Sequence, residues 1–120
     1  MLWYHYVSYF FGGLFLTNAI PHVVRGLMGQ PFQSPFAKPP GEGLSSSTVN
    51  VVWGFFNVAM GYLLLLHVGD FDLRSFAHVA PVAVAAFGGS LMLARSFGRF
   101  HGGNDPLTQQ AANPAIPKGK

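Results

Sequence analysis

Three histidines are the residues of this sequence with the clearest capacity for chemistry. His5 lies near the N-terminus, His67 follows a run of four leucines, and His78 comes eleven residues later. Imidazole is a good ligand for zinc, copper or haem iron, and facing helices of a bundle often carry such sites. If the fold places them at one depth, they form a candidate site for a metal ion or haem. No tight motif such as HxxxH is present, so roles as interfacial anchors or hydrogen-bonding core residues stay open.

A second group of polar residues lies within otherwise apolar sequence and could bind a ligand. It consists of Asn18, His22, Arg25, Asn50 and Asn57. The first three follow one another at steps of four and three, which places them on one face of a helix. Such a face could hold an anionic lipid headgroup, a quinone carbonyl or the carboxylate of a partner protein.

The same residues also have a structural interpretation. Asn18 and Asn57 are expected at matching depths, where an amide pair holds two helices together by about 0.6–2 kcal/mol. Arg25 would then extend to the membrane surface, and His22 would bond a backbone carbonyl that Pro21 leaves without a partner. The ligand-binding and the structural interpretations both stay open.

The elements that must position these residues are three apolar spans. Half of the chain is hydrophobic and only 9% is charged, against roughly a quarter in an ordinary globular protein. No charged residue occurs in 1–24, 43–69 or 75–94, and about 20 apolar residues in a helix cross the bilayer core. The sequence therefore predicts an all-α integral membrane bundle of three transmembrane helices. The spans are expected at about residues 2–28, 48–69 and 73–97.

Small and polar residues mark the faces on which these helices are expected to pack. Asn50, Gly54, Asn57 and Gly61 follow at steps of four, three and four, so they share one face of the second span. That face predicts a helix neighbour instead of lipid. The third span is expected to be an antiparallel neighbour of the second. Its small residues recur every four positions, at Ala77, Pro81, Ala85 and Gly89.

The connection over residues 29–47 is rich in turn-forming residues. It contains four prolines and three glycines, which exclude a regular helix or a central strand. We expect an irregular path at the membrane interface, with Phe32 and Phe36 directed toward lipid or toward a partner subunit. An ordinary connector is the alternative.

Basic residues predict the orientation of the chain. With three spans, residues 29–47 and the C-terminal tail share a side that carries six of the seven Lys and Arg residues, and only Arg74 lies on the other. Cytoplasmic loops carry such an excess of positive charge, so the N-terminus is expected outside and the C-terminus in the cytoplasm. Residues 1–100 would form the membrane domain. The polar tail, 101–120, is expected to be extended or disordered unless a partner orders it.

Several functional classes are disfavoured by what the sequence lacks. No Asp or Glu lies inside a span, so the proton-coupled carboxylate of small multidrug transporters is missing. GxSxG, HExxH, GxGxxG and P-loop motifs do not occur, and neither does Cys. The basic residues are scattered and form no nucleic-acid-binding stripe. An enzyme would depend on the histidines or on a partner subunit.

Three runs in the first half of the chain resemble a known pattern. They are NAIPHVVRGLMGQPF, SPFAKPPGEGLSS and NVVWGFFN, which together cover about residues 18–57. The pattern resembles that of small bacterial inner-membrane proteins to which no activity is assigned. The resemblance implies a location in the inner membrane and carries no cofactor or catalytic residue.

These observations lead to one main functional expectation and two alternatives. The main expectation is a non-catalytic small membrane protein, an accessory or structural subunit of a larger membrane complex or a homo-oligomer. It follows from the small and polar faces, which exceed what three helices bury among themselves. The alternatives are a membrane protein that binds haem or a metal ion through the three histidines, and a small transporter or lipid- or quinone-binding protein that uses the second polar group.

Overall fold

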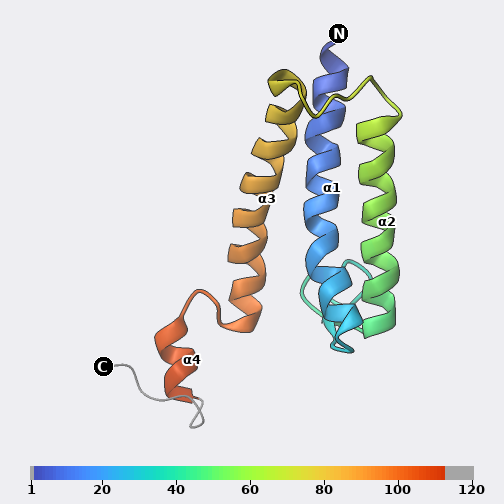
Figure 1. The fold of residues 1–120 in the computed structure, drawn as a ribbon. Coiled ribbons are helices and arrows are strands. Elements are labelled where there is room, and N and C mark those ends of the chain that lie inside the picture. The colour runs from blue at the N-terminus through green and yellow to red at the C-terminus, as the bar shows by residue number, and fades with distance from the viewer. Residues whose placement is uncertain (1, 113–120) are drawn as a thin grey trace. The chain divides into compact units, whose positions relative to one another are not determined.

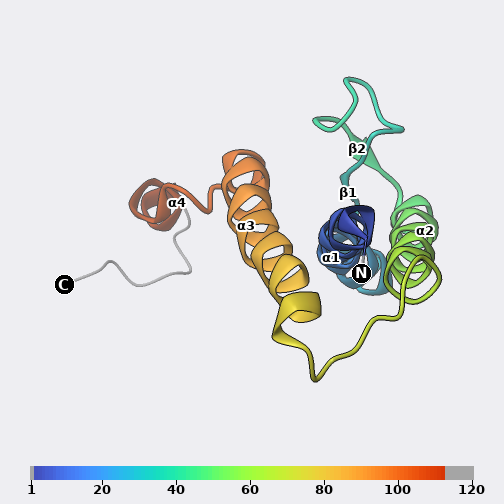
Figure 2. The ribbon, with the colours of Figure 1, turned by 90° about the horizontal axis from the view of Figure 1, so that it is seen from above.

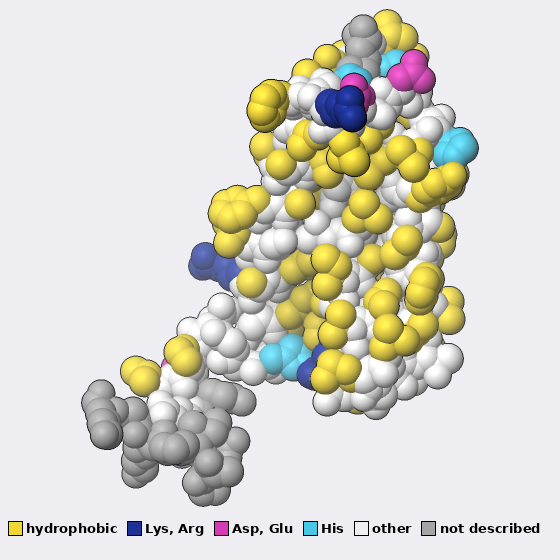
Figure 3. All heavy atoms as spheres, in the orientation of Figure 1, with side chains coloured by type: hydrophobic (Ala, Val, Ile, Leu, Met, Phe, Trp, Pro, Cys, Tyr) yellow, Lys and Arg dark blue, Asp and Glu magenta, His cyan; other side chains and the backbone are white. Residues whose placement is uncertain are grey.

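The computed structural model describes residues 2–112, and most of them are helical (Figure 1). The helices are α1 (Trp3–Leu27), α2 (Ser47–Leu66), α3 (Phe76–His101) and the short α4 (Pro106–Ala112), and the strands are β1 (Phe32–Gln33) and β2 (Leu44–Ser45). Helices α1, α2 and α3 are long and apolar enough to cross a membrane. Figure 3 shows hydrophobic side chains spread along the helices on one face of the molecule. The predicted helical fold with three candidate spans is therefore confirmed.

Three helix ends differ by three or four residues from the predicted spans. The second helix ends at Leu66, three residues early, and the third runs from Phe76 to His101, three residues late at its start and four residues longer at its end. The connection between them is held by its own hydrogen bonds: the Asp72 carboxylate accepts from Arg74 N, and Ser75 Oγ accepts from His78 N. Ser75 thus acts as the N-cap that sets the start of α3.

The C-terminal region also departs from its prediction. A short helix, α4, occupies part of the tail expected to be extended, and it begins at Pro106, a residue suited to the first helical position. Residues 113–120 lie outside the described part of the chain. The chain divides into two compact units, Met1–Ser90 and Leu91–Lys120. Within the second unit, the Asn104 side chain folds back onto α3 and donates to Arg95 O at 2.8 Å.

In the first unit, α1 and α2 run antiparallel and pack side by side (Figures 1 and 2). The buried residues of α2 are Asn50, Gly54, Asn57 and Gly61. This confirms the predicted packing face of α2, and the neighbour it requires is α1 of the same chain. At Gly54 a Cβ atom would lie 3.0 Å from Val23 N and 3.3 Å from Ala19 O, so only glycine allows the two backbones this close.

The first part of α3, residues 76–90, packs on α1. Ala85 and Gly89 are its buried residues, and a Cβ atom on Gly13 of α1 would lie 2.9 Å from Val82 O. Helix α1 therefore lies between α2 and this part of α3 (Figure 2). The prediction that the second and third spans are neighbours is wrong. Ala77, from the same predicted row of small residues, is exposed.

The connection between α1 and α2 is more ordered than its composition predicts. Strands β1 and β2 pair antiparallel, with Phe32 opposite Ser45 and Gln33 opposite Leu44. The connection joins α1 and α2 at one end of the helix pair, which we call the loop end. Because β1 also contacts α1, the loop is folded back onto the helices instead of hanging free.

Candidate functional site

Polar residues between α1 and α2 form hydrogen bonds at three separate levels, and we call these residues together the polar seam. Its residues are Ser8, Asn18, His22, Asn50 and Asn57. At the end away from the loop, Ser8 Oγ donates to Leu64 O at 2.6 Å. In the middle, Asn18 Nδ2 donates to Asn57 Oδ1 at 3.0 Å, and Asn57 Nδ2 donates to Trp53 O at 2.8 Å. The predicted amide pair at matching depth is present.

Asn50 is the centre of the seam at the loop end. Its amide nitrogen lies 3.1 Å from Phe32 O, and 3.2 Å and 3.0 Å from the carbonyl oxygens of Ser45 and Ser46. Its oxygen faces His22 Nδ1 at 2.7 Å. Since the amide nitrogen is directed at carbonyl oxygens, the amide oxygen is the acceptor and His22 Nδ1 carries a proton. One side chain, 0% exposed, thus ties α1, both strands and α2 together.

His22 takes part in the seam through its Nδ1 atom, which bonds the Asn50 side chain. The expected bond from His22 to a backbone carbonyl stays a prediction. Of the five residues proposed to bind a ligand, Asn18, His22, Asn50 and Asn57 therefore bond one another within the chain. They lie in the packing interface of two helices, and the atoms named above are bonded to protein groups.

Arg25 differs from the rest of that group. Its guanidinium carbon lies 5.5 Å above the centre of the Phe32 ring, a cation–π contact. Its Nε atom is buried and has no hydrogen-bond partner among the described residues. Phe32 also meets His22 edge to face, with ring centres 5.4 Å apart. Arg25 thus brings a positive charge to the loop end.

The two loop phenylalanines have different environments. Phe32 is only 5% exposed, so the prediction that it faces lipid or a partner is wrong. The reason is that Asn50 bonds the carbonyl of Phe32 and holds β1 against the helices. Phe36 is 64% exposed, which agrees with the expectation of an outward-facing ring.

The three histidines do not form one ligand group. Within residues 2–112, no cluster of three or more His, Asp or Glu side chains could hold a metal ion. His67 Nε2 lies 3.0 Å from the Tyr62 hydroxyl, and His78 Nδ1 accepts from Asp72 N at 2.9 Å. His5 Nδ1 is buried beside Gly69 without a hydrogen-bond partner in the described part of the chain. Each imidazole therefore has its own local setting.

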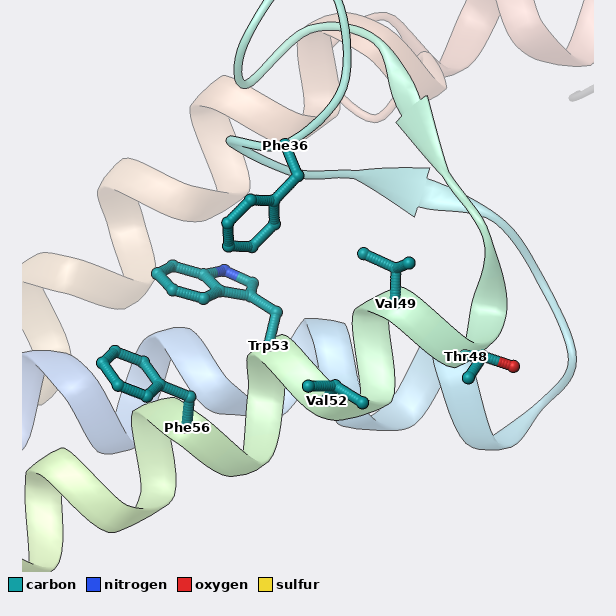
Figure 4. Close-up of a pocket in the computed structure, with 6 residues that line it drawn as sticks. All are labelled: Phe36, Thr48, Val49, Val52, Trp53 and Phe56. Atoms are coloured by element: carbon teal, nitrogen blue, oxygen red, sulfur yellow. The ribbon is translucent and has the colours of Figure 1, made fainter.

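An apolar groove lies on the outside of α2 at the loop end (Figure 4). Its volume is about 510 Å³. The lining residues, which we call the aromatic groove, are Phe36, Thr48, Val49, Val52, Trp53 and Phe56. The sequence-based interpretation missed this site except for Phe36. The available signal was a row of apolar residues at positions 49, 52, 53 and 56, which is the helical spacing of a single face.

Comparisons with protein-family models, with curated protein sequences and with solved structures find no match, so the site is interpreted from its own geometry.

Proposed function

We propose that this protein is a non-catalytic, multi-pass membrane protein that serves as an accessory subunit of a larger membrane assembly. We place it in the bacterial inner membrane, with the N-terminus outside and the C-terminus in the cytoplasm. The location is supported by three helices long and apolar enough to span and by the resemblance described above. The orientation is supported by the basic residues, six of seven of which fall on one side.

The observation that carries the proposal is the polar seam. Catalytic side chains must present a polar atom to a substrate. The in-span amides, Asn50 and Asn57, are instead 0% and 1% exposed and bonded to protein groups. Because these polar side chains hold two helices and a loop in place, their chemistry supports a structural role.

An assembly role is favoured by the exposure of α3. Of its residues between 76 and 90, only Ala85 and Gly89 are buried. A Cβ atom added at Gly88 would meet no atom within 4 Å, so this small residue presents a flat surface that the described chain leaves open. Small residues allow close approach of another helix in a membrane. That helix would belong to another subunit, or to a second copy of this chain.

The test compares two leucine substitutions on α3. The protein is extracted in mild detergent from its native membrane, crosslinked, and weighed by native mass spectrometry. We expect wild-type protein to run as an assembly, and Gly88→Leu to reduce the assembled fraction by about tenfold, equivalent to about 1.4 kcal/mol. Ala83→Leu adds the same side chain at an exposed position away from Gly88 and should leave the assembly intact.

The masses also identify the partner. Additional chains of other mass would support an accessory subunit, and multiples of one mass would make the protein a homo-oligomer. A wild-type protein that is only ever monomeric would contradict the proposal.

A further inference from the structure

The Phe36 side chain covers the aromatic groove, and the loop holds this side chain in place. Ser34 is buried, its Oγ atom lies 2.5 Å from Ser45 Oγ, and it accepts a hydrogen bond from Phe36 N at 3.1 Å. Gly41 N donates to Ser34 O at 2.8 Å and closes the turn that follows. These bonds fix the backbone at Phe36, whose ring remains largely exposed. The exposed Phe36 ring is part of one contiguous apolar surface with residues of α2, and such a surface indicates an interaction site.

The other walls of the groove come from one face of α2. Val49 and Val52 lie on one side of the Phe36 ring, and Trp53 and Phe56 lie on the other (Figure 4). Trp53 meets Phe36 edge to face at 5.2 Å and stacks on Phe56 at 5.6 Å. Since α2 is apolar enough to span a membrane, the groove would open onto hydrocarbon. Its volume of about 510 Å³ is within the usual range for small-ligand sites.

The surface of the groove is apolar, because the Trp53 Nε1 atom is buried and does not reach it. Thr48, at the rim, is the second residue of α2. The groove therefore starts at the edge of the apolar segment, where the bilayer core meets the headgroup region.

The charges at the loop end favour an anionic ligand. Arg25 and Lys38 outnumber the one acidic residue of this region, Glu42. Arg25 contacts Phe32, which contacts His22, and the His22 ring centre lies 6.3 Å from that of Trp53. The positive charge and the groove thus belong to one cluster of rings. Basic groups at a membrane surface attract anionic headgroups.

We propose that the aromatic groove binds one acyl chain of an anionic glycerophospholipid. The acyl chain would lie against Val49 and Val52 beneath Phe36. The headgroup would lie on the side of Arg25 and Lys38. This inference rests on the membrane location alone and is independent of the assembly role of α3.

The test uses Trp53 as a fluorescent reporter. The chain has two tryptophans, so Trp3→Phe at the far end of α1 leaves Trp53 as the only one. The protein is reconstituted in vesicles in which a small fraction of lipid carries brominated acyl chains, which quench tryptophan on contact. We expect quenching by brominated phosphatidylglycerol to exceed the curve for random lipid contact. The affinity of the groove for brominated phosphatidylglycerol should be about fivefold higher than its affinity for brominated phosphatidylcholine.

Matched variants locate the site. Val52→Phe places an aromatic ring in the groove at a residue that is 67% exposed and outside the polar seam. This variant should lower quenching to the level expected for random lipid contact. Phe36→Ala, which removes the ring that covers the groove, should do the same. Val58→Phe makes the same change on α2 outside the groove and should keep the excess. Far-UV circular dichroism of each variant checks that the helices remain.

Three outcomes would overturn the proposal. The first is random-contact quenching in the Trp3→Phe protein, and the second is equal quenching of Val52→Phe and Val58→Phe. The third is protection of Trp53 by a quinone or a second copy of the chain, detected by native mass spectrometry of the same sample. Equal excess quenching by the two brominated lipids would remove the anionic headgroup from the proposal.

Discussion

The α1–α2 pair and the first part of α3 both carry rows of small residues, but only the first row is buried along its length. On α2 the steps between Asn50, Gly54, Asn57 and Gly61 are four, three and four, and all four residues are buried. At about 100° per residue these steps keep the four positions within about 60° of one another. The row is one true face, and α1 covers it.

The row on α3 has equal steps, and this changes its geometry. Steps of four advance by about 40° each, so the row rotates by about 120° between position 77 and position 89. Ala85 and Gly89 are buried against α1, whereas Ala77 is exposed. A regular repeat of small residues is therefore a weaker packing signal than an alternation of four and three. Three sets of substitutions test this contrast.

Gly54→Leu should have the largest effect. A Cβ atom there already meets backbone atoms of Val23 and Ala19 at 3.0–3.3 Å, so the helices would have to separate. We expect a loss of more than about 3 kcal/mol in the free energy of unfolding, measured by denaturant titration in micelles. Ala83→Leu is the control, since its side chain is exposed and lies away from Gly88. If both variants unfold alike, the contrast between the two helices is lost.

Asn50→Leu should rank second. It leaves His22 Nδ1 and the carbonyls of Phe32, Ser45 and Ser46 without their shared partner. Since buried unpaired groups cost about 1–3 kcal/mol each and some will find water at the loop end, we expect a total loss of about 2–3 kcal/mol. Protease sensitivity of residues 29–47 should rise with it. A loop as resistant as in wild type would show that Asn50 does not hold it.

Ala77→Leu should have the smallest effect. Ala77 is exposed, so the free energy of unfolding should change by less than about 0.5 kcal/mol. Ala85→Leu, eight positions along the same predicted row, should cost about 1–3 kcal/mol because Ala85 is 1% exposed. The same titration measures both. Equal effects would mean that the row acts as one face after all.

Local patterns predicted the parts of the fold that depend on one helix at a time. The three candidate spans follow from uncharged windows, and the buried face of α2 follows from the spacing of its Asn and Gly residues. The pairing of Asn18 with Asn57 needed only equal depth in antiparallel helices. These features are encoded within one segment, or within two segments of known length.

Features that depend on the loop could not be predicted this way. Phe32 is buried because Asn50, eighteen residues later, binds its carbonyl, a contact between a loop and a helix. His67 bonds the Tyr62 hydroxyl and His78 bonds the backbone of Asp72, contacts that the spacing of the histidines does not indicate. The aromatic groove needs Phe36 to be folded back over α2, which composition alone does not indicate.

The hydrogen bonds of Asn50 also determine the order in which the parts of the chain fold during synthesis. Asn50 accepts a hydrogen bond from His22 of α1. It donates to Phe32 O in the loop and to Ser46 O at the start of α2. During synthesis, α1 and the loop emerge first. His22 and the carbonyl of Phe32 can bond Asn50 only when α2 lies beside α1. We therefore expect the loop to fold last, after α1 and α2 have inserted side by side. Truncated chains that end before residue 50 should therefore keep the loop open to protease.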